Sequence, residues 1–243
     1  MVSVGWGMNL SGPAAADDSA EVISTVAEPS GEVTFPERIL FLGNSITLHG
    51  PAPQIGWTGN WGMAASRQEY DYVHRLLSKV MEQTGHRPQS MIRNIADFER
   101  TPTEFDIPKQ LASEVAFRPD LIIIAIGENA ARPETDAAKQ KFAQDFRRLV
   151  STLGQGTSAK IFVRSQFWPD PVRDGLMQQV TNELGHHFVD ISAEVNESCY
   201  ARSERAIEHA GVAAHPGDQG MQVIAEALWR SIQKSCCSEK SSR

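Results

Sequence analysis

The sequence predicts an α/β protein, a three-layer sandwich around a doubly wound parallel sheet of about five strands. Short apolar runs alternate with longer segments of helical periodicity, which is typical of βαβ units and a parallel sheet. The strongest run, residues 121–126, is apolar throughout, as in strands buried on both faces. The 243-residue chain is 41% apolar, which is sufficient for an ordinary hydrophobic core.

The expected elements follow one another from Pro36 onward. Strands are expected at residues 39–42, 90–95, 121–126, 160–164 and 187–190. Helices are expected around residues 73–80, 108–116, 142–150, 172–184 and 221–232, largely from apolar residues on one helical face. Right-handed crossovers between such strands give a flavodoxin-like arrangement with helices on both faces of the sheet.

Composition divides the chain into three expected segments. Residues 1–35 are a flexible N-terminal arm with a short edge strand around 33–35, residues 36–235 are the domain, and residues 236–243 are a polar tail that exposes Cys236 and Cys237. Residues 1–20 lack Lys and Arg, yet 12–17 resemble the end of a signal peptide. The chain therefore fits either an exported or a cytoplasmic protein, and its oligomeric state is not indicated.

Charge and motifs argue against several classes of function. The net charge of −7 argues against nucleic acid or an anionic membrane as the main partner. The longest apolar run is far shorter than the ~20 residues of a membrane span. The three cysteines lack zinc-ligand spacing, and the strands are followed by neither GxGxxG nor GxxxxGK[ST]. We therefore expect no metal, no cofactor and no nucleotide.

Three short blocks at or near the carboxyl ends of strands carry the candidate chemistry, because ligands bind at that edge of such sheets. Gly43-Asn44-Ser45 follows the first strand, Gly127-Glu128-Asn129 follows the third, and His215-Pro216-Gly217 precedes the last helix. A serine hydroxyl, an asparagine amide and an imidazole are the groups of a nucleophile, an oxyanion donor and a general base. Taken singly, Ser45 also fits a helix N-cap and Asn129 an Asx turn.

Together, these blocks resemble the SGNH (GDSL-like) hydrolase superfamily over roughly 200 residues. The resemblance implies Ser45 as nucleophile, His215 as general base, and Asn129, the Ser45 N–H and Gly127 at the oxyanion hole. The family's Gly-Asp-Ser is here Gly-Asn-Ser, and Ala130 replaces the Asp of its Gly-x-Asn-Asp block.

Two further departures concern the catalytic machinery. Val212 stands where the family commonly has the Asp that orients its His. Glu99 is our candidate orienting acid, with Asp97, Glu208, a backbone carbonyl or a water as alternatives. The family's oxyanion Gly after the second strand has no match, so a backbone N–H around Phe98 or Glu99 is expected to replace it.

A long loop after Ser45 is expected to form the rim of the site, because long loops without structure of their own are usually functional. Trp57 and Trp61 in this loop either stack on a sugar ring or wall an acyl pocket, or they anchor the loop on the body. Trp168, after the fourth strand, is placed on the same rim. His49 is either a second polar group of the pocket or a structural histidine.

The expected function is a serine esterase that removes a small acyl group, most simply acetyl, from a carbohydrate through an acyl-enzyme. The expected partner is thus a small-molecule or glycan ester. An acyltransferase or lipid esterase would use the same residues. The alternative from another class is a catalytically impaired binding protein on the same scaffold, since fold alone does not guarantee activity.

Overall fold

We describe the protein from a computed structural model. The structure describes residues 1–2 and 35–238. The chain divides into two units, Met1–Glu32 and Val33–Arg243, and the features below belong to the second. The expected edge strand at 33–35 falls largely outside the described residues, but Phe35 itself is not in a strand, and its ring stacks on Trp229 at 5.7 Å.

Five parallel strands form the central sheet in the order β2-β1-β3-β4-β5. The strands are β1 (Arg38–Gly43), β2 (Gln89–Asn94), β3 (Leu121–Ala125), β4 (Lys160–Arg164) and β5 (His187–Val189). All four strand pairings are parallel. The predicted α/β class and doubly wound sheet are therefore confirmed, and each strand begins and ends within one residue of its expected bounds.

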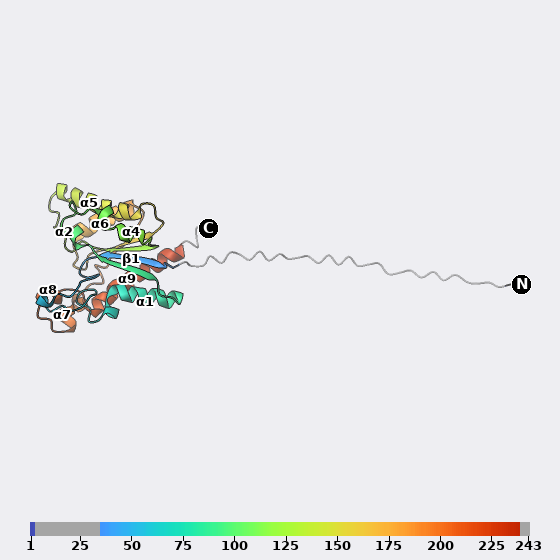
Figure 1. Cartoon of the computed structure of the whole chain (residues 1–243), viewed down its shortest axis with the longest axis horizontal. Coiled ribbons are helices and arrows are strands. Elements are labelled where there is room, and N and C mark those ends of the chain that lie inside the picture. The colour runs from blue at the N-terminus through green and yellow to red at the C-terminus, as the bar shows by residue number, and fades with distance from the viewer. Residues whose placement is uncertain (3–34, 239–243) are drawn as a thin grey trace. The chain divides into compact units, whose positions relative to one another are not determined.

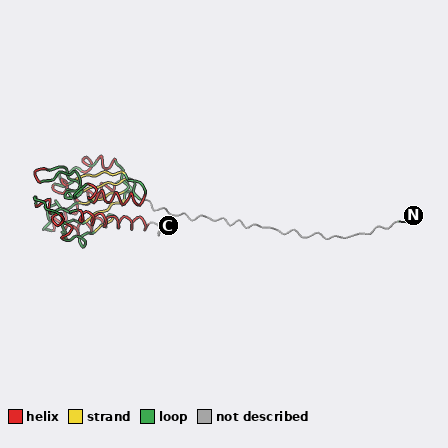
Figure 2. Tube along the Cα trace, turned by 90° about the horizontal axis from the view of Figure 1, so that it is seen from below, coloured by secondary structure: helices red, strands yellow, loops and turns green. Residues whose placement is uncertain are grey.

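Helices cover both faces of the sheet, as Figure 1 shows, and the strands lie between them in Figure 2. The α-helices are α1 (Tyr72–Thr84), α2 (Ala96–Arg100), α3 (Ile107–Gln110), α4 (Ala112–Ala116), α5 (Asp136–Gly154), α6 (Pro171–Glu183), α7 (Ala201–Glu204), α8 (Ala210–Ala213) and α9 (Asp218–Ser238). Three 3₁₀ turns are η1 (Pro53–Ile55), η2 (Gln68–Tyr70) and η3 (Glu197–Cys199).

The alternation of side chains along β1 explains the three layers, because successive residues of a strand point to opposite faces. Ile39 and Phe41 pack in the core beneath α1 and α9. Leu40 and Leu42 pack in the other core, with the apolar residues of α5 and α6. All four are fully buried, as expected for a strand at the centre of a parallel sheet.

Two details differ from the sequence-based expectations. The helix expected at 108–116 is two short helices, because the backbone at the fully buried Leu111 leaves the helical conformation. At the C-terminus, α9 continues through Ser238, and Cys236 is buried in the core rather than exposed in a polar tail. The cysteine lies on the apolar side of an amphipathic helix, four residues after Ile232, so the helical period brings both to the same face.

Candidate active site

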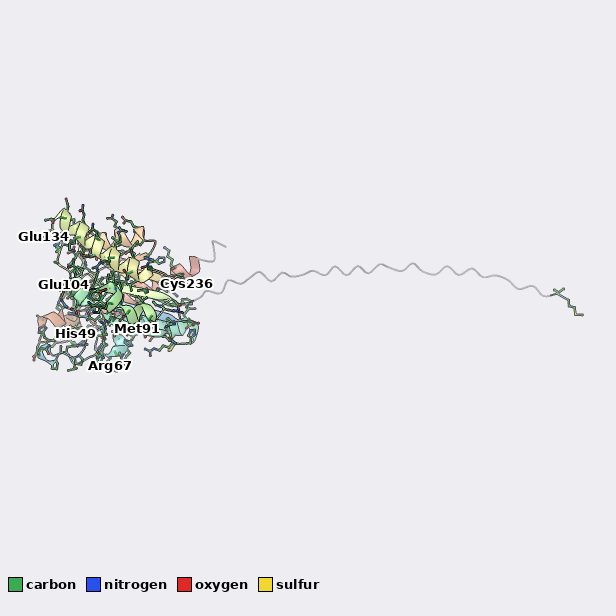
Figure 3. The ribbon with its side chains drawn as sticks, turned by 45° about the horizontal axis from the view of Figure 1, so that its top comes forward. His49, Arg67, Met91, Glu104, Glu134 and Cys236 are labelled. Carbon is green, nitrogen blue, oxygen red and sulfur yellow. The ribbon has the colours of Figure 1, made fainter. Side chains whose placement is uncertain are left out.

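The candidate site lies at the carboxyl ends of β1 and β3, the point where the strand order of the sheet reverses. Such switch points are the usual ligand sites of open α/β sheets. Ser45 follows β1, Asn129 follows β3, and His215 lies in the loop between α8 and α9. Figure 3 places His49, which belongs to this end of the sheet, and the buried Cys236 toward opposite ends of the domain.

Ser45 lies in a tight turn and does not begin a helix. The carbonyl of Asn44 accepts hydrogen bonds from the N–H groups of Thr47 and Leu48, both at 3.0 Å. The Asn44 side chain also accepts from the Ile46 N–H at 3.1 Å. The helix N-cap alternative for Ser45 is thus wrong. Its hydroxyl is instead free to face His215, and Ser45 Oγ lies 2.9 Å from His215 Nε2.

The other ring nitrogen of His215 faces a backbone carbonyl: Nδ1 is 2.7 Å from the oxygen of Gly211. Because a carbonyl can only accept, Nδ1 must carry the proton, and Nε2 of the neutral ring is free to accept the Ser45 proton. Burial lowers the pKa of His215, against a raising contribution from its bond to Gly211. The neutral, proton-accepting form is therefore favoured.

Glu99 does not have the orienting position suggested by the sequence. Its carboxylate accepts hydrogen bonds from the Asn44 side chain, which follows β1, and from the Gly127 N–H and the Asn129 side chain, which follow β3. The position opposite His215 Nδ1 is filled by the Gly211 carbonyl, one of the alternatives considered. Val212 cannot orient the ring, and its buried side chain packs into the cluster under the loop that follows β1.

Trp168 supports His215 from the side. Its indole N–H donates to the Ala214 carbonyl at 3.0 Å, and its ring meets the imidazole edge-on at 5.2 Å between centroids. Trp168 is thus in contact with the histidine, but it is not among the residues that line the pocket. This position corrects the expectation that Trp168 forms part of the substrate rim.

Asn129 reaches the pocket, but Gly127 does not supply an oxyanion donor. The Gly127 N–H is already bonded to Glu99 Oε1 at 2.5 Å, so that expectation is wrong. The backbone of Gly127 has φ of +123°, and a Cβ there would lie 2.9 Å from Gln166 Cγ. Glycine is therefore required at this position for conformation and close packing.

Around Phe98 and Glu99, where a backbone donor is expected, the Phe98 N–H is not available because it is bonded to the Ile95 carbonyl. The Asp97 N–H next to it is a candidate, so a backbone donor in this stretch stays a prediction. Among the described residues, the N–H groups of Ser45 and Asp97 have no hydrogen-bond acceptor in the protein. Asp97 lines the pocket together with Ser45 and Asn129.

Beneath the site lies a buried polar network that the sequence did not indicate. Burial opposes the ionisation of Glu128, but Arg164 at 2.8 Å and the Phe167 N–H outweigh it, and the pKa of Glu128 is lowered. Burial, followed by the charge of Glu128, raises the pKa of Glu99. The Asn44 amide bridges the pair, donating to Glu128 at 2.8 Å and to Glu99 at 3.2 Å.

A pocket of about 430 Å³ opens above Ser45. Its apolar residues include Ile55, Met63 and Val212, and its polar residues include His49, Asp97, Asn129, Arg100 and His209. His49 therefore belongs to the pocket, although its Nδ1 is bonded to the Gly50 carbonyl at 2.6 Å. The lining contains no tryptophan within the described part of the chain.

Trp57 and Trp61 hold the loop together instead of lining the pocket, the second of the two alternatives. Trp57 is only 7% exposed, and its N–H donates to the His49 carbonyl at 3.1 Å. The two rings pack edge to face at 5.5 Å, and Trp61 donates to the Ala65 carbonyl. Their packing fixes the loop that places His49, Ile55 and Met63 around the pocket.

No group of three His, Cys, Asp or Glu side chains among residues 1–2 and 35–238 is arranged to hold a metal ion. In the same residues, no helix has the length and apolar character needed to cross a membrane.

Solved structures with a similar fold include esterases and lipases. A two-domain esterase active on acetylated mannans matches with a TM-score of 0.55 and 16% identity, over 81% of this chain and 48% of that one. The lipase/acylhydrolase from Enterococcus faecalis matches with a TM-score of 0.53 and 16% identity, over 82% and 96%. A family two carbohydrate esterase from Clostridium thermocellum, solved in complex with cellohexaose, matches with a TM-score of 0.52 and 16% identity. The match covers 82% of this chain and 64% of that one.

These likenesses give the chain the fold of the SGNH hydrolases. The chain spans about half the length of the mannan esterase. No family model matches the sequence, and no curated protein does. The likeness to these proteins is therefore one of fold.

Proposed function

We propose that this protein is a serine esterase that acts through an acyl-enzyme on Ser45. The observation that carries the proposal is the 2.9 Å contact between Ser45 Oγ and His215 Nε2, with His215 Nδ1 held by a carbonyl on its other side. This is the geometry of a nucleophile beside a general base whose tautomer is fixed.

In the proposed reaction, His215 takes the Ser45 proton as Oγ attacks the ester carbonyl, and then passes it to the leaving alcohol. Water attacks the acyl-enzyme in the second half, with His215 as base again. The Ser45 N–H, the Asn129 amide and the Asp97 N–H are the candidate donors to the oxyanion. No cofactor enters any of these steps.

The lack of an acid on His215 is compatible with catalysis. Replacing the triad Asp by Asn in a serine protease costs ~10⁴ in kcat because the histidine then adopts the wrong tautomer. The Gly211 carbonyl imposes the productive tautomer on His215. What a carbonyl lacks is the negative charge that stabilises the imidazolium, so the proposed enzyme loses only that part of the acid's contribution.

For the substrate we propose a short acyl ester, acetyl foremost, on a carbohydrate. The pocket is partly polar and about 430 Å³, which suits a small acyl group on a hydrophilic alcohol better than a long acyl chain. Similar folds include an esterase active on acetylated mannans, also crystallised with mannopentaose. The inward packing of Trp57 and Trp61 removes the argument from sugar stacking, so support for a sugar comes from these relatives and the polar lining.

The test compares hydrolysis of p-nitrophenyl acetate by the wild type with that by Ser45→Ala and His215→Ala. Both variants should lose at least about 10³-fold in kcat/KM, since nucleophile and base act as a unit. Ser78→Ala is the matched control, because Ser78 Oγ bonds a carbonyl of its own helix. Equal rates in wild type and Ser45→Ala would overturn the proposal and favour a binding protein.

The substrate class is tested separately. Acetate release from acetylated mannan and xylan is measured beside hydrolysis of p-nitrophenyl butyrate and octanoate. Faster turnover of octanoate than of acetate, with no acetate released from either glycan, would contradict the carbohydrate assignment and favour a lipid esterase.

A further inference from the structure

The Asn129 side chain is held at both ends of its amide. Its Nδ2 donates to Glu99 Oε2 at 2.7 Å, and its Oδ1 accepts from the Arg100 guanidinium at 3.3 Å. The backbone N–H of Asn129 lies 3.3 Å from the other carboxylate oxygen, Oε1 of Glu99. Glu99 is 5% exposed, so this contact is shielded from water.

These contacts fix which way the amide points. A flipped Asn129 would turn its oxygen toward the Glu99 carboxylate and its NH₂ toward the Arg100 guanidinium, and both contacts would be repulsive. In the observed orientation, Glu99 takes one of the two Nδ2 hydrogens. The second hydrogen remains for the pocket that Asn129 shares with Ser45.

We propose that Glu99 is a positioning residue of the oxyanion hole, and that Glu99 and Arg100 together set the Asn129 amide for donation to the oxyanion. The inference rests on the proposed esterase function. It gives Glu99 a task different from orienting His215, and it brings in Arg100, which has no counterpart among the three motif blocks.

The same carboxylate also ties the hole to the nucleophile. Glu99 Oε1 accepts from the Gly127 N–H at 2.5 Å and from the Asn44 side chain at 3.2 Å. Asn44 directly precedes Ser45, and Gly127 begins the turn that carries Asn129. Glu99 thus bonds to the turn after β1, which carries the nucleophile, and to the turn after β3, which carries the oxyanion donor. These bonds hold the two turns at a fixed separation.

The turn that bears Asn129 is also held from outside. Arg173 Nη1 donates to the Gly127 carbonyl at 2.7 Å and to the Ala130 carbonyl at 2.5 Å. The backbone of the turn is therefore anchored independently of Glu99 Oε2. Changing that one oxygen is expected to release the Asn129 side chain without moving the turn.

Glu99→Gln makes this change. The amide oxygen of Gln can keep the position of Oε1 and its bonds to Asn44 and Gly127, while its NH₂ faces Asn129 Nδ2, donor against donor. A misplaced catalytic group costs about 10²-fold, and we expect that loss in kcat on p-nitrophenyl acetate, with KM nearly unchanged. Loss of transition-state interaction alone produces that split.

A double-mutant cycle shows whether Glu99 acts through Asn129. Asn129→Ala alone should cost about 10²–10³-fold, as for removal of one oxyanion donor. In that background, Glu99→Gln should cost less than about fivefold further, because coupled residues are not additive. An equal loss from Glu99→Gln in both backgrounds, or no loss in the wild-type background, would overturn the proposal.

Two further variants guard against a folding artefact. Arg100→Gln changes a half-exposed side chain at the other end of the amide and should lower kcat about tenfold, within the range of a misaligned group. Glu114→Gln is the matched control, since Glu114 is also buried but contacts Ser113 and Arg93 in another part of the fold. Its kcat should equal that of wild type.

A spectroscopic readout keeps this inference separate from the proposed function. The side-chain ¹H–¹⁵N signals of Asn129, assigned by their loss in Asn129→Ala, should show slow hydrogen exchange in the wild type and fast exchange in Glu99→Gln. If wild type hydrolyses no ester but the signals behave in this way, the esterase proposal fails and the positioning contact stands. Unchanged signals in Glu99→Gln would overturn the contact itself.

Discussion

Asn44→Asp, which creates the Gly-Asp-Ser sequence of the SGNH hydrolases that the chain resembles, should damage this protein. The Asn44 amide is fully buried and donates to Glu128 at 2.8 Å and to Glu99 at 3.2 Å. An ionised aspartate in its place would meet two carboxylates at about 3 Å, each repelling it by ~5 kcal/mol at an effective dielectric constant of about 20. Protonating the new carboxyl is the cheaper outcome.

That protonation sets the magnitude. Holding a carboxyl of ordinary pKa about 3.9 in its neutral form costs ~1.4 kcal/mol per pH unit, which gives ~4 kcal/mol at pH 7 and ~1.5 kcal/mol at pH 5. The raised folded-state pKa means that the variant is closest to wild type at low pH and falls behind it as pH rises. Urea unfolding of both proteins at pH 5 and pH 7 measures the gap.

The pH dependence of that gap is the decisive feature. A variant as stable as wild type at pH 7, or a loss of equal size at both pH values, would refute the electrostatic account of Asn44. Glu99→Gln combined with Asn44→Asp should recover part of the loss, because one of the two carboxylates is then neutral. Asn196→Asp is the control: this exposed cap residue accepts from Ser198 through Oδ1, which Asp keeps, and its only donated bond is a long one to the Glu194 carbonyl at 3.3 Å. The change should shift stability by less than ~0.5 kcal/mol.

Three other predictions concern the pKa of His215, the backbone of Gly127 and the support of His215 by Trp168. The acid limb of the kcat/KM profile should have its midpoint below ~6.5, because burial lowers the pKa of His215 and only neutral His accepts the proton; a midpoint at 7 or above would contradict this. Gly127→Ala should cost at least ~1–3 kcal/mol in unfolding free energy, given its φ of +123°, whereas Gly175→Ala, in open space on α6, should not destabilise. Trp168→Phe removes the bond to Ala214 and should lower kcat about fivefold, the equivalent of ~1 kcal/mol; an unchanged kcat would remove Trp168 from the support of His215.

The sequence predicts those parts of the structure that depend on local pattern. Continuous apolar runs locate the buried strands, and parallel pairing then brings the residues after β1 and β3 to one edge. This is why Ser45 and Asn129 line one pocket. The motif singles out His215, and the structure places its Nε2 2.9 Å from Ser45 Oγ; its role as base stays a prediction.

The rest depends on contacts that leave no local signal. Every residue has a carbonyl, so nothing in the sequence distinguishes Gly211 as the partner of His215 Nδ1. Glu99 contacts Asn129, which lines the pocket, but the sequence does not indicate this partner, because it depends on how α2 packs against the turn after β3. In the sequence, Arg164 is an ordinary strand residue and Glu128 an ordinary loop residue. Only the fold shows that both are buried, with 2.8 Å between Arg164 Nη2 and Glu128 Oε1. Of the residues in the buried network, only Asn44 carries a hint in the sequence, because it replaces the acidic residue of the Gly-Asp-Ser block that the chain resembles.

The central claim is that Ser45 is a nucleophile activated by His215. Labelling of the intact protein with a fluorophosphonate, followed by peptide mass spectrometry, tests it most directly because it requires no knowledge of the natural ester. We predict one adduct on Ser45, absent in Ser45→Ala and formed at least about 10²-fold more slowly in His215→Ala. A protein that remains unlabelled, or that is labelled at another residue, would contradict the claim.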